Sequence, residues 1–201
     1  MSVVFDPKPI LLEGRHVRLE PLAEHHRPLL HRAAVGQDVF TWFLTDSLAK
    51  PEAMDRWLDE ALRAQAAGTE VAFATVRRSD GCVVGSTRYL DIRRPHRGLE
   101  IGNTWLQREA QRTALNTEAK YLMIRQAFEG WNAVRVQLKT DERNERSRAA
   151  ILRIGAKYEG ILRRYQARFD GYVRNTAIYA ITAEDWPDTK VRMEAMLARA
   201  G

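Results

Sequence analysis

A strand–helix–strand pattern at the middle of the chain constrains the fold more than any other feature. Residues 98–106 and 134–138 have the character of β-strands, and residues 117–128 between them carry apolar side chains at helical spacing. Two strands of one sheet that are joined through a helix run parallel, with a right-handed crossover. We therefore expect at least one parallel strand pair.

The remaining segments predict antiparallel hairpins and flanking helices. Asp80-Gly81 and Asp170-Gly171 each lie between two apolar runs, which is typical of a hairpin turn. The other expected elements are a strand at 16–21, helices at 22–35 and 51–67, strands at 71–77 and 82–92, a helix at 144–154, strands at 158–168 and 172–181, and a helix from 186 onward. The sum is an α+β fold with a mixed sheet, in one domain spanning residues 1–201.

Composition limits the class of partner. The 201 residues carry a net charge of +6, mostly from arginine, which favours an anionic partner such as a phosphorylated cofactor. The arginines are dispersed and no groove-reading motif is present, so nucleic-acid binding is not favoured. No apolar run approaches the ~20 residues of a membrane span, and a cytoplasmic protein is expected. The single cysteine, Cys82, is expected in the core.

The first candidate site covers residues 105–120, where a strand ends and a helix begins. Free backbone N–H groups and the helix dipole at such a start can hold a pyrophosphate. Arg112 would add charge-assisted hydrogen bonds, and Asn116 or Thr117 is expected to cap the helix. The alternative interpretation is an ordinary capped helix after a loop.

Two further candidates lie near this segment in the expected fold. Asn144 starts a helix and would cap it, with Ser147 at the third helical position. Both side chains would also lie at the mouth of that helix. Glu100 alternates with Leu99 and Ile101 and therefore faces the other side of its strand. We interpret Glu100 either as a solvated residue or as a carboxylate base in a groove.

The arrangement of these candidates resembles the GNAT superfamily of N-acetyltransferases. The signature of that superfamily, Gln/Arg-x-x-Gly-x-Gly/Ala between a strand and a helix, falls on residues 111–116 (QRTALN). Gln111 matches the first position, whereas Ala114 and Asn116 replace the glycines. Because glycine lets the backbone approach phosphate closely, we expect an altered path or weaker binding. Asn144-x-x-Ser147 and residues 152–156 (LRIGA) resemble the later GNAT segment.

The similarity extends in particular to the Rim-type branch, the ribosomal-protein N-terminal acetyltransferases and their bacterial relatives. It is carried by residues 13–22, 116–122, 139–147 and 184–187. It implies that acetyl-CoA lies where the strands at 98–106 and 134–138 splay apart, and it implies no metal. The implied coenzyme-binding residues are Trp105, Leu106, Gln111, Arg112, Thr113, Ala114, Leu115, Asn116, Thr117, Asn144, Arg146 and Ser147.

The same resemblance implies catalytic roles. The N–H of Leu106 would stabilise the oxyanion, Glu100 would act as the base, and Ser147 would protonate the departing thiolate. Asn144 would position the pantetheine. Ile151 stands where many GNAT proteins carry a tyrosine acid, and Gln166 stands where some Rim-type members carry a glutamate. Arg112, Arg143 and Arg146 are candidates for the remaining phosphate charge.

Several alternatives stay open at this point. The acceptor would be a primary amine, either a protein or peptide N-terminus or a small amine, amino acid or antibiotic. A GNAT-shaped module that binds acyl-CoA without catalysis is the alternative from another class. The aromatic region around Trp42, Phe43 and Trp57 is interpreted as an acceptor-site wall or as a subunit contact, so a homodimer and a monomer both remain open.

Overall fold

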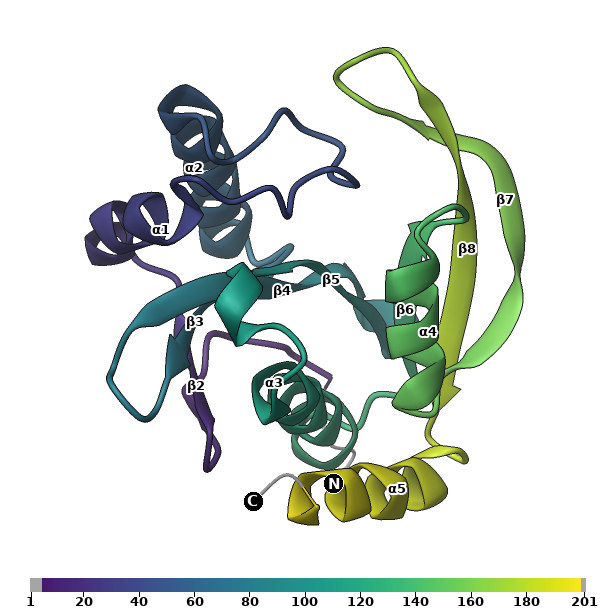
Figure 1. Ribbon diagram of the computed structural model, residues 1–201. Helices are drawn as coiled ribbons and strands as arrows, with labels where there is room; N and C mark the ends of the chain where they lie inside the picture. The colour runs from purple at the N-terminus through teal and green to yellow at the C-terminus, as the bar shows by residue number, and fades with distance from the viewer. Residues whose placement is uncertain (1–4, 200–201) are drawn as a thin grey trace.

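A mixed β-sheet organises the chain. The strands are β1 (Leu12–Glu13), β2 (Val17–Pro21), β3 (Val71–Arg77), β4 (Val83–Arg93), β5 (Gly98–Leu106), β6 (Arg135–Asp141), β7 (Lys157–Ala167) and β8 (Val173–Thr182). The computed structural model describes residues 5–199, and within them these strands form one sheet in the order β1-β2-β3-β4-β5-β6-β8-β7 (Figure 1). In this sheet β5 and β6 are parallel and the other neighbouring strands are antiparallel. The expected α+β fold with a mixed sheet is confirmed.

Helices cover both faces of the sheet. They are α1 (Arg27–Ala34), α2 (Pro51–Ala66), α3 (Ala114–Arg125), α4 (Glu145–Arg153) and α5 (Trp186–Ala198). Figure 1 shows α1 and α2 on one side of the sheet and α3 and α5 on the other. No helix within residues 5–199 has the length and apolar content that crossing a lipid bilayer requires.

Two hydrophobic cores result, one on each face. β3 contributes to both, because Phe73 packs in the core that holds α3 and α5 whereas Ala72 packs in the core that holds α1 and α2. A strand buried on both faces has a nearly continuous apolar run, and residues 71–76 are all buried with Thr75 as their single polar side chain. Trp57 of α2 is 3% exposed and belongs to the second core, so it is neither a surface contact nor an open wall.

The parallel pairing of β5 with β6 is short. It covers three residue pairs, from Gly98 with Arg135 to Glu100 with Gln137. β5 nevertheless continues to Leu106 and β6 to Asp141. The two strands therefore part beyond Glu100, and this opening lies between α3 and α4.

Three sequence-based predictions were wrong in detail. The helix predicted at 117–128 begins at Ala114, because Thr113 caps it. Residues 22–35 form a short 3₁₀ turn and then α1, whose Pro28 suits a first helical turn. Cys82 is exposed, because it belongs to the β3–β4 turn, where its N–H donates to the Asp80 carboxylate.

A buried carboxylate fixes the N-terminal segment to α3. Glu118 accepts hydrogen bonds from the backbone N–H groups of Arg15, His16 and Val17 at 2.6–2.8 Å. The side chain is 6% exposed, and three N–H donors supply the charge with the partners that a buried carboxylate needs. This contact positions residues 15 and 16 beside the start of α3.

We expect Glu118→Gln to lower the free energy of unfolding by about 2 kcal/mol, because the amide loses the charge and one acceptor oxygen. Urea unfolding measures the change. Glu13→Gln is the matched control, since Glu13 forms an exposed pair with Arg78, which contributes little. A Glu118→Gln protein as stable as the Glu13→Gln protein would contradict this role.

Candidate active site

In the opening between β5 and β6, the β5 backbone beyond Glu100 has no ladder partner in β6. The N–H of Gln107 donates to the Val84 carbonyl at 2.8 Å, on the β4 side. Successive N–H groups of an extended chain point in opposite directions, so the N–H of Leu106 points toward β6 and into the opening. β4 approaches β5 so closely here that a Cβ atom on Gly85 would lie 2.0 Å from the Trp105 carbonyl oxygen. Glycine at this position therefore permits the close approach.

The start of α3 lies at the end of this opening. The Thr113 hydroxyl accepts from the Leu115 N–H at 3.3 Å and donates to the Ala110 carbonyl at 2.8 Å. Asn116 lies within the first turn of α3 and does not cap it. The residue in left-handed conformation is Arg112, with φ +60°. Ala114 and Asn116, which stand where the GNAT signature has glycine, are both helical. Their backbone conformation therefore does not require glycine.

Arginines that are dispersed in the sequence gather around the start of α3. Two hollows flank Thr113 and Ala114 there. Arg15, Arg77 and Arg78 line the first hollow, and Arg112 and Arg153 line the second. Arg77 pairs with Asp80 and with Glu109, which also lines the first hollow, and Arg78 pairs with Glu13. Arg15, Arg112 and Arg153, together with the helix dipole, therefore make this end of α3 a favourable place for an anion.

Of these five arginines, sequence reasoning identified Arg112 alone. Arg153 donates to the Thr117 hydroxyl at 3.1 Å, which places α4 against α3. No local pattern marks Arg15, Arg77, Arg78 or Arg153, because three separate parts of the chain bring them together.

Gln111 connects the two sides of the opening. Its amide nitrogen donates to the Leu106 carbonyl at 2.9 Å, and its amide oxygen accepts from Arg146 at 3.0 Å. Leu106 ends β5, whereas Arg146 lies in the first turn of α4. The structure thus brings Gln111 and Arg146 together, as their joint assignment to the coenzyme site requires.

The start of α4 presents a hydroxyl. The Asn144 side chain accepts from the Ser147 N–H at 3.1 Å, which is the predicted cap. The Ser147 hydroxyl forms no hydrogen bond with residues 5–199 and is half-buried, so it remains available to a ligand. Ile151, one turn further on, is buried in the core.

Glu100 lies where β5 and β6 part, and it is not solvated. The side chain is 2% exposed, and its Oε2 accepts from Lys139 at 2.9 Å and from Gln137 at 3.2 Å. Burial raises the pKa of Glu100 above its ordinary value, and Lys139 and Gln137 oppose that shift. The sequence did not reveal this pairing, since Lys139 belongs to a different strand.

The α1–α2 loop and the tip of the β7–β8 hairpin meet on the far side of the opening (Figure 1). Arg168 donates to the Thr41 carbonyl at 2.6 Å, and the Phe169 N–H donates to the Leu44 carbonyl at 2.8 Å. The Arg143 guanidinium lies 3.9 Å from the ring centre of Tyr172 and also faces Trp42. Arg143 therefore belongs to this junction, and its assignment to phosphate charge stays a prediction.

Gln166 also has a partner in this region. Its side-chain oxygen accepts from Arg174 at 2.8 Å, and Arg174 also donates to the Thr176 hydroxyl. Burial lowers the pKa of Arg174, which is 6% exposed. Gln166 thus holds a buried guanidinium on the β8 strand.

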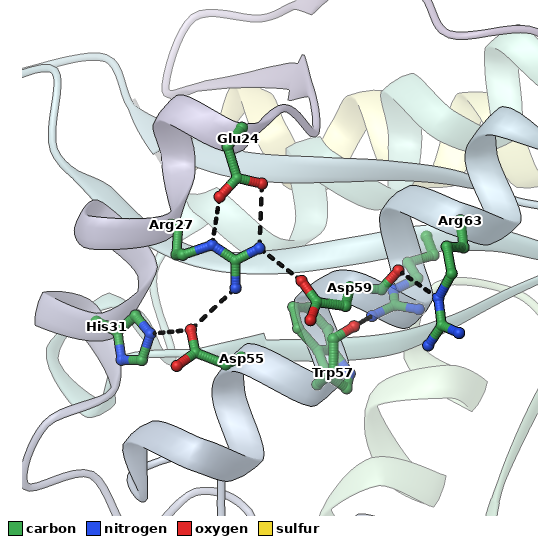
Figure 2. A network of polar contacts seen from close by, with 8 residues as sticks. Glu24, Arg27, His31, Asp55, Trp57, Asp59 and Arg63 are labelled. Carbon is green, nitrogen blue, oxygen red and sulfur yellow. Dashed lines mark hydrogen bonds and ion pairs between the residues drawn. The ribbon is translucent and has the colours of Figure 1, made fainter.

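A polar network fixes α1 against α2 and so supports the loop between them. Figure 2 shows Arg27 bonded to Glu24, Asp55 and Asp59, with His31 bonded to Asp55 at 2.8 Å. These acids together raise the pKa of Arg27. The loop that contacts the hairpin is thereby held at both ends.

Comparisons with known proteins agree with this geometry. The family model described as "Acetyltransferase (GNAT) domain" matches residues 16–157. The fold is similar to a GCN5-related N-acetyltransferase from Brucella melitensis, with a TM-score of 0.89 and 28% identity over 98% of this chain and 89% of that one. It is also similar to an acetyltransferase candidate from T. thermophilus, with a TM-score of 0.84 and 36% identity over 95% and 98% of the two chains.

One similar structure contains a coenzyme. Mycobacterium smegmatis RimJ in complex with CoA-disulfide has a TM-score of 0.79 and 20% identity, over 96% of this chain and 95% of that one. At that identity the likeness concerns the fold. No curated protein matches the sequence.

We expect Lys139→Met to lower the free energy of unfolding near neutral pH by about 3 kcal/mol, because it leaves the buried Glu100 carboxylate without its cation. The substitution raises the pKa of Glu100 further, so the folded protein holds a proton that the unfolded chain releases. The lost stability should therefore return as the pH falls toward about 5.

Urea unfolding at both pH values measures this effect. Adding Glu100→Gln to Lys139→Met should restore stability near neutral pH, since no charge then remains buried. Equal losses at the two pH values, or no restoration in the double variant, would show that the ion pair does not control stability here.

Proposed function

The chain belongs to the GNAT family of acetyltransferases, and we propose that it transfers the acetyl group of acetyl-CoA to a primary amine, a protein or peptide N-terminus. The observation that carries this proposal is the end of the β5–β6 ladder just beyond the buried Glu100, together with the arginine-lined hollows at the start of α3. A carboxylate at one end and an anion site at the other suit an amine acceptor and a diphosphate-bearing donor.

The start of α3 would bind the diphosphate. The first N–H groups of a helix lack partners within the helix. Those of Ala114 and Asn116 lie near Arg112 and Arg153, whereas the Leu115 N–H already donates to the Thr113 hydroxyl. The pantetheine would lie along β5, where the Leu106 N–H faces the opening, and Asn144 would position it. Gln111 and Arg146 would shape the passage between the two ends.

The chemistry requires two proton transfers. The neutral amine attacks the thioester carbonyl carbon, and the Leu106 N–H stabilises the oxyanion of the tetrahedral intermediate. Glu100 takes the proton from the amine, directly or through one water. The intermediate then expels the thiolate, which takes a proton from the Ser147 hydroxyl while that hydroxyl takes one from solvent water, so Ser147 stays neutral. Glu100 returns its proton to solvent at the end of the cycle. The raised pKa of Glu100 suits a base, since a more basic carboxylate holds the proton better.

The preference for a peptide N-terminus rests on the Rim-type resemblance. A small amine and a non-catalytic acyl-CoA-binding module are the competing functions. An acetyl-CoA assay across peptides with different N-termini, free amino acids, polyamines and aminoglycosides distinguishes them. We expect the highest kcat/KM with a peptide. Preference for a small amine would change the acceptor, and tight acetyl-CoA binding without turnover on any amine would favour the module.

We expect Ser147→Ala to lower kcat by about 10²-fold, as removal of a proton donor does, with little change in the KM for acetyl-CoA. Thermal stability should stay at the wild-type value, because the hydroxyl bonds no residue among 5–199. Steady-state kinetics and thermal unfolding measure the two effects.

Asn144→Ala serves as the contrasting variant, because loss of a helix cap costs about 1 kcal/mol of stability. If Ser147→Ala lost as much stability as Asn144→Ala, or kept full activity, Ser147 would have only a structural role.

A further inference from the structure

A lysine without a carboxylate partner is buried beneath β5. Lys120 of α3 is 7% exposed, and its Nζ donates to the Thr104 hydroxyl at 2.6 Å and to the Thr87 hydroxyl at 3.1 Å. Within residues 5–199 no acidic side chain forms an ion pair with it. Lysine is almost never buried unless it is paired, so this placement needs an explanation.

The two hydroxyls mark an irregularity in the β4–β5 ladder. The register shifts between Ser86 and Arg88, so that Asn103 and Thr104 together oppose Thr87. Asn103 has φ +48°, a left-handed conformation. These are the features of a β-bulge, which bends one strand and redirects its groups. The Thr104 and Thr87 hydroxyls are themselves 2.8 Å apart.

The bulge immediately precedes the part of β5 that faces the opening. Thr104 lies two residues before Leu106, whose N–H points toward β6. The direction of that N–H therefore depends on the conformation of the bulge. An oxyanion donor must lie within a few tenths of an ångström of its place, because a misplacement of about 1 Å can slow a reaction about 10²-fold.

Burial explains how the lysine can be tolerated there. Desolvation lowers the pKa of Lys120 to about 7. A neutral amine retains two N–H donors, and the two threonine hydroxyls match them in number. Lys120 thus holds both strands at the bulge without a full buried charge.

We propose that Lys120 is a positioning residue that holds the bulge of β5 through Thr104 and so directs the Leu106 N–H into the opening. The effect on rate rests on the proposed function, whereas the hold on the bulge does not. Lys120 acts from the α3 side of the sheet and contacts no residue that we assign to proton transfer.

The test uses Lys120→Met and Thr104→Val, which remove the two ends of the hydrogen bond while nearly preserving volume. Thr87→Val is the matched control, because it removes a buried hydroxyl that Lys120 also contacts but that lies on β4. Amide hydrogen exchange of residues 102–106 is measured without coenzyme. The kcat and the KM for acetyl-CoA are measured with the best acceptor.

We expect Lys120→Met and Thr104→Val to accelerate exchange at 102–106 and to lower kcat by about 10-fold to 100-fold, with a much smaller change in KM. Thr87→Val should change both measurements much less than Thr104→Val, because the hydrogen bond from Lys120 to Thr104 remains. A purely structural lysine would instead accelerate exchange throughout α3 and β4 and leave kcat unchanged in the folded protein.

The outcomes separate the two proposals. Wild-type exchange and kcat in Lys120→Met, or equal effects of Thr87→Val and Thr104→Val, would overturn the positioning role while acetyl transfer stands. A different result is that Lys120→Met accelerates exchange only at residues 102–106 while the wild-type protein acetylates no amine. Lys120 would then still hold the bulge, but the proposed function would be wrong.

Discussion

The structure depends on where the parallel ladder between β5 and β6 stops. After three residue pairs the strands part, although each continues for several residues. A strand edge without a neighbouring strand leaves backbone donors and acceptors that need other hydrogen-bond partners. Each assigned site feature lies along this opening: Glu100 where it begins, Leu106 on its β5 side and the starts of α3 and α4 at its end. An extended chain that carries amides, such as pantetheine, can supply the missing partners.

The binding surface that we propose at the start of α3 depends on conformation and charge more than on glycine. Ala114 and Asn116 are helical, and the left-handed residue of this loop is Arg112. The Arg112 side chain brings a positive charge to the proposed anion site, which a glycine would not. The family signature can therefore lose its glycines here and keep free N–H groups at a helix start. Gln111 then holds the neighbouring strand end and α4 at a fixed separation.

Local patterns predicted the elements well and the contacts between them poorly. The bounds of β3 and β5 match the predicted strands, because alternation and turn residues are encoded nearby. The start of α3 was predicted at residue 117, whereas the helix begins at Ala114 because Thr113 supplies the cap. The burial of Glu100 depends on Lys139, and the arginines at α3 come from distant segments. Such long-range pairings leave no local signal, whereas the family resemblance did place Gln111 and Arg146 together.

A crystal structure of the protein with bound CoA tests the central claim most directly. The account predicts the diphosphate at the start of α3, against the N–H groups of Ala114 and Asn116, and the pantetheine between β5 and β6 with its sulfur near Leu106. CoA bound elsewhere, or an opening closed by side chains at full coenzyme occupancy, would contradict it.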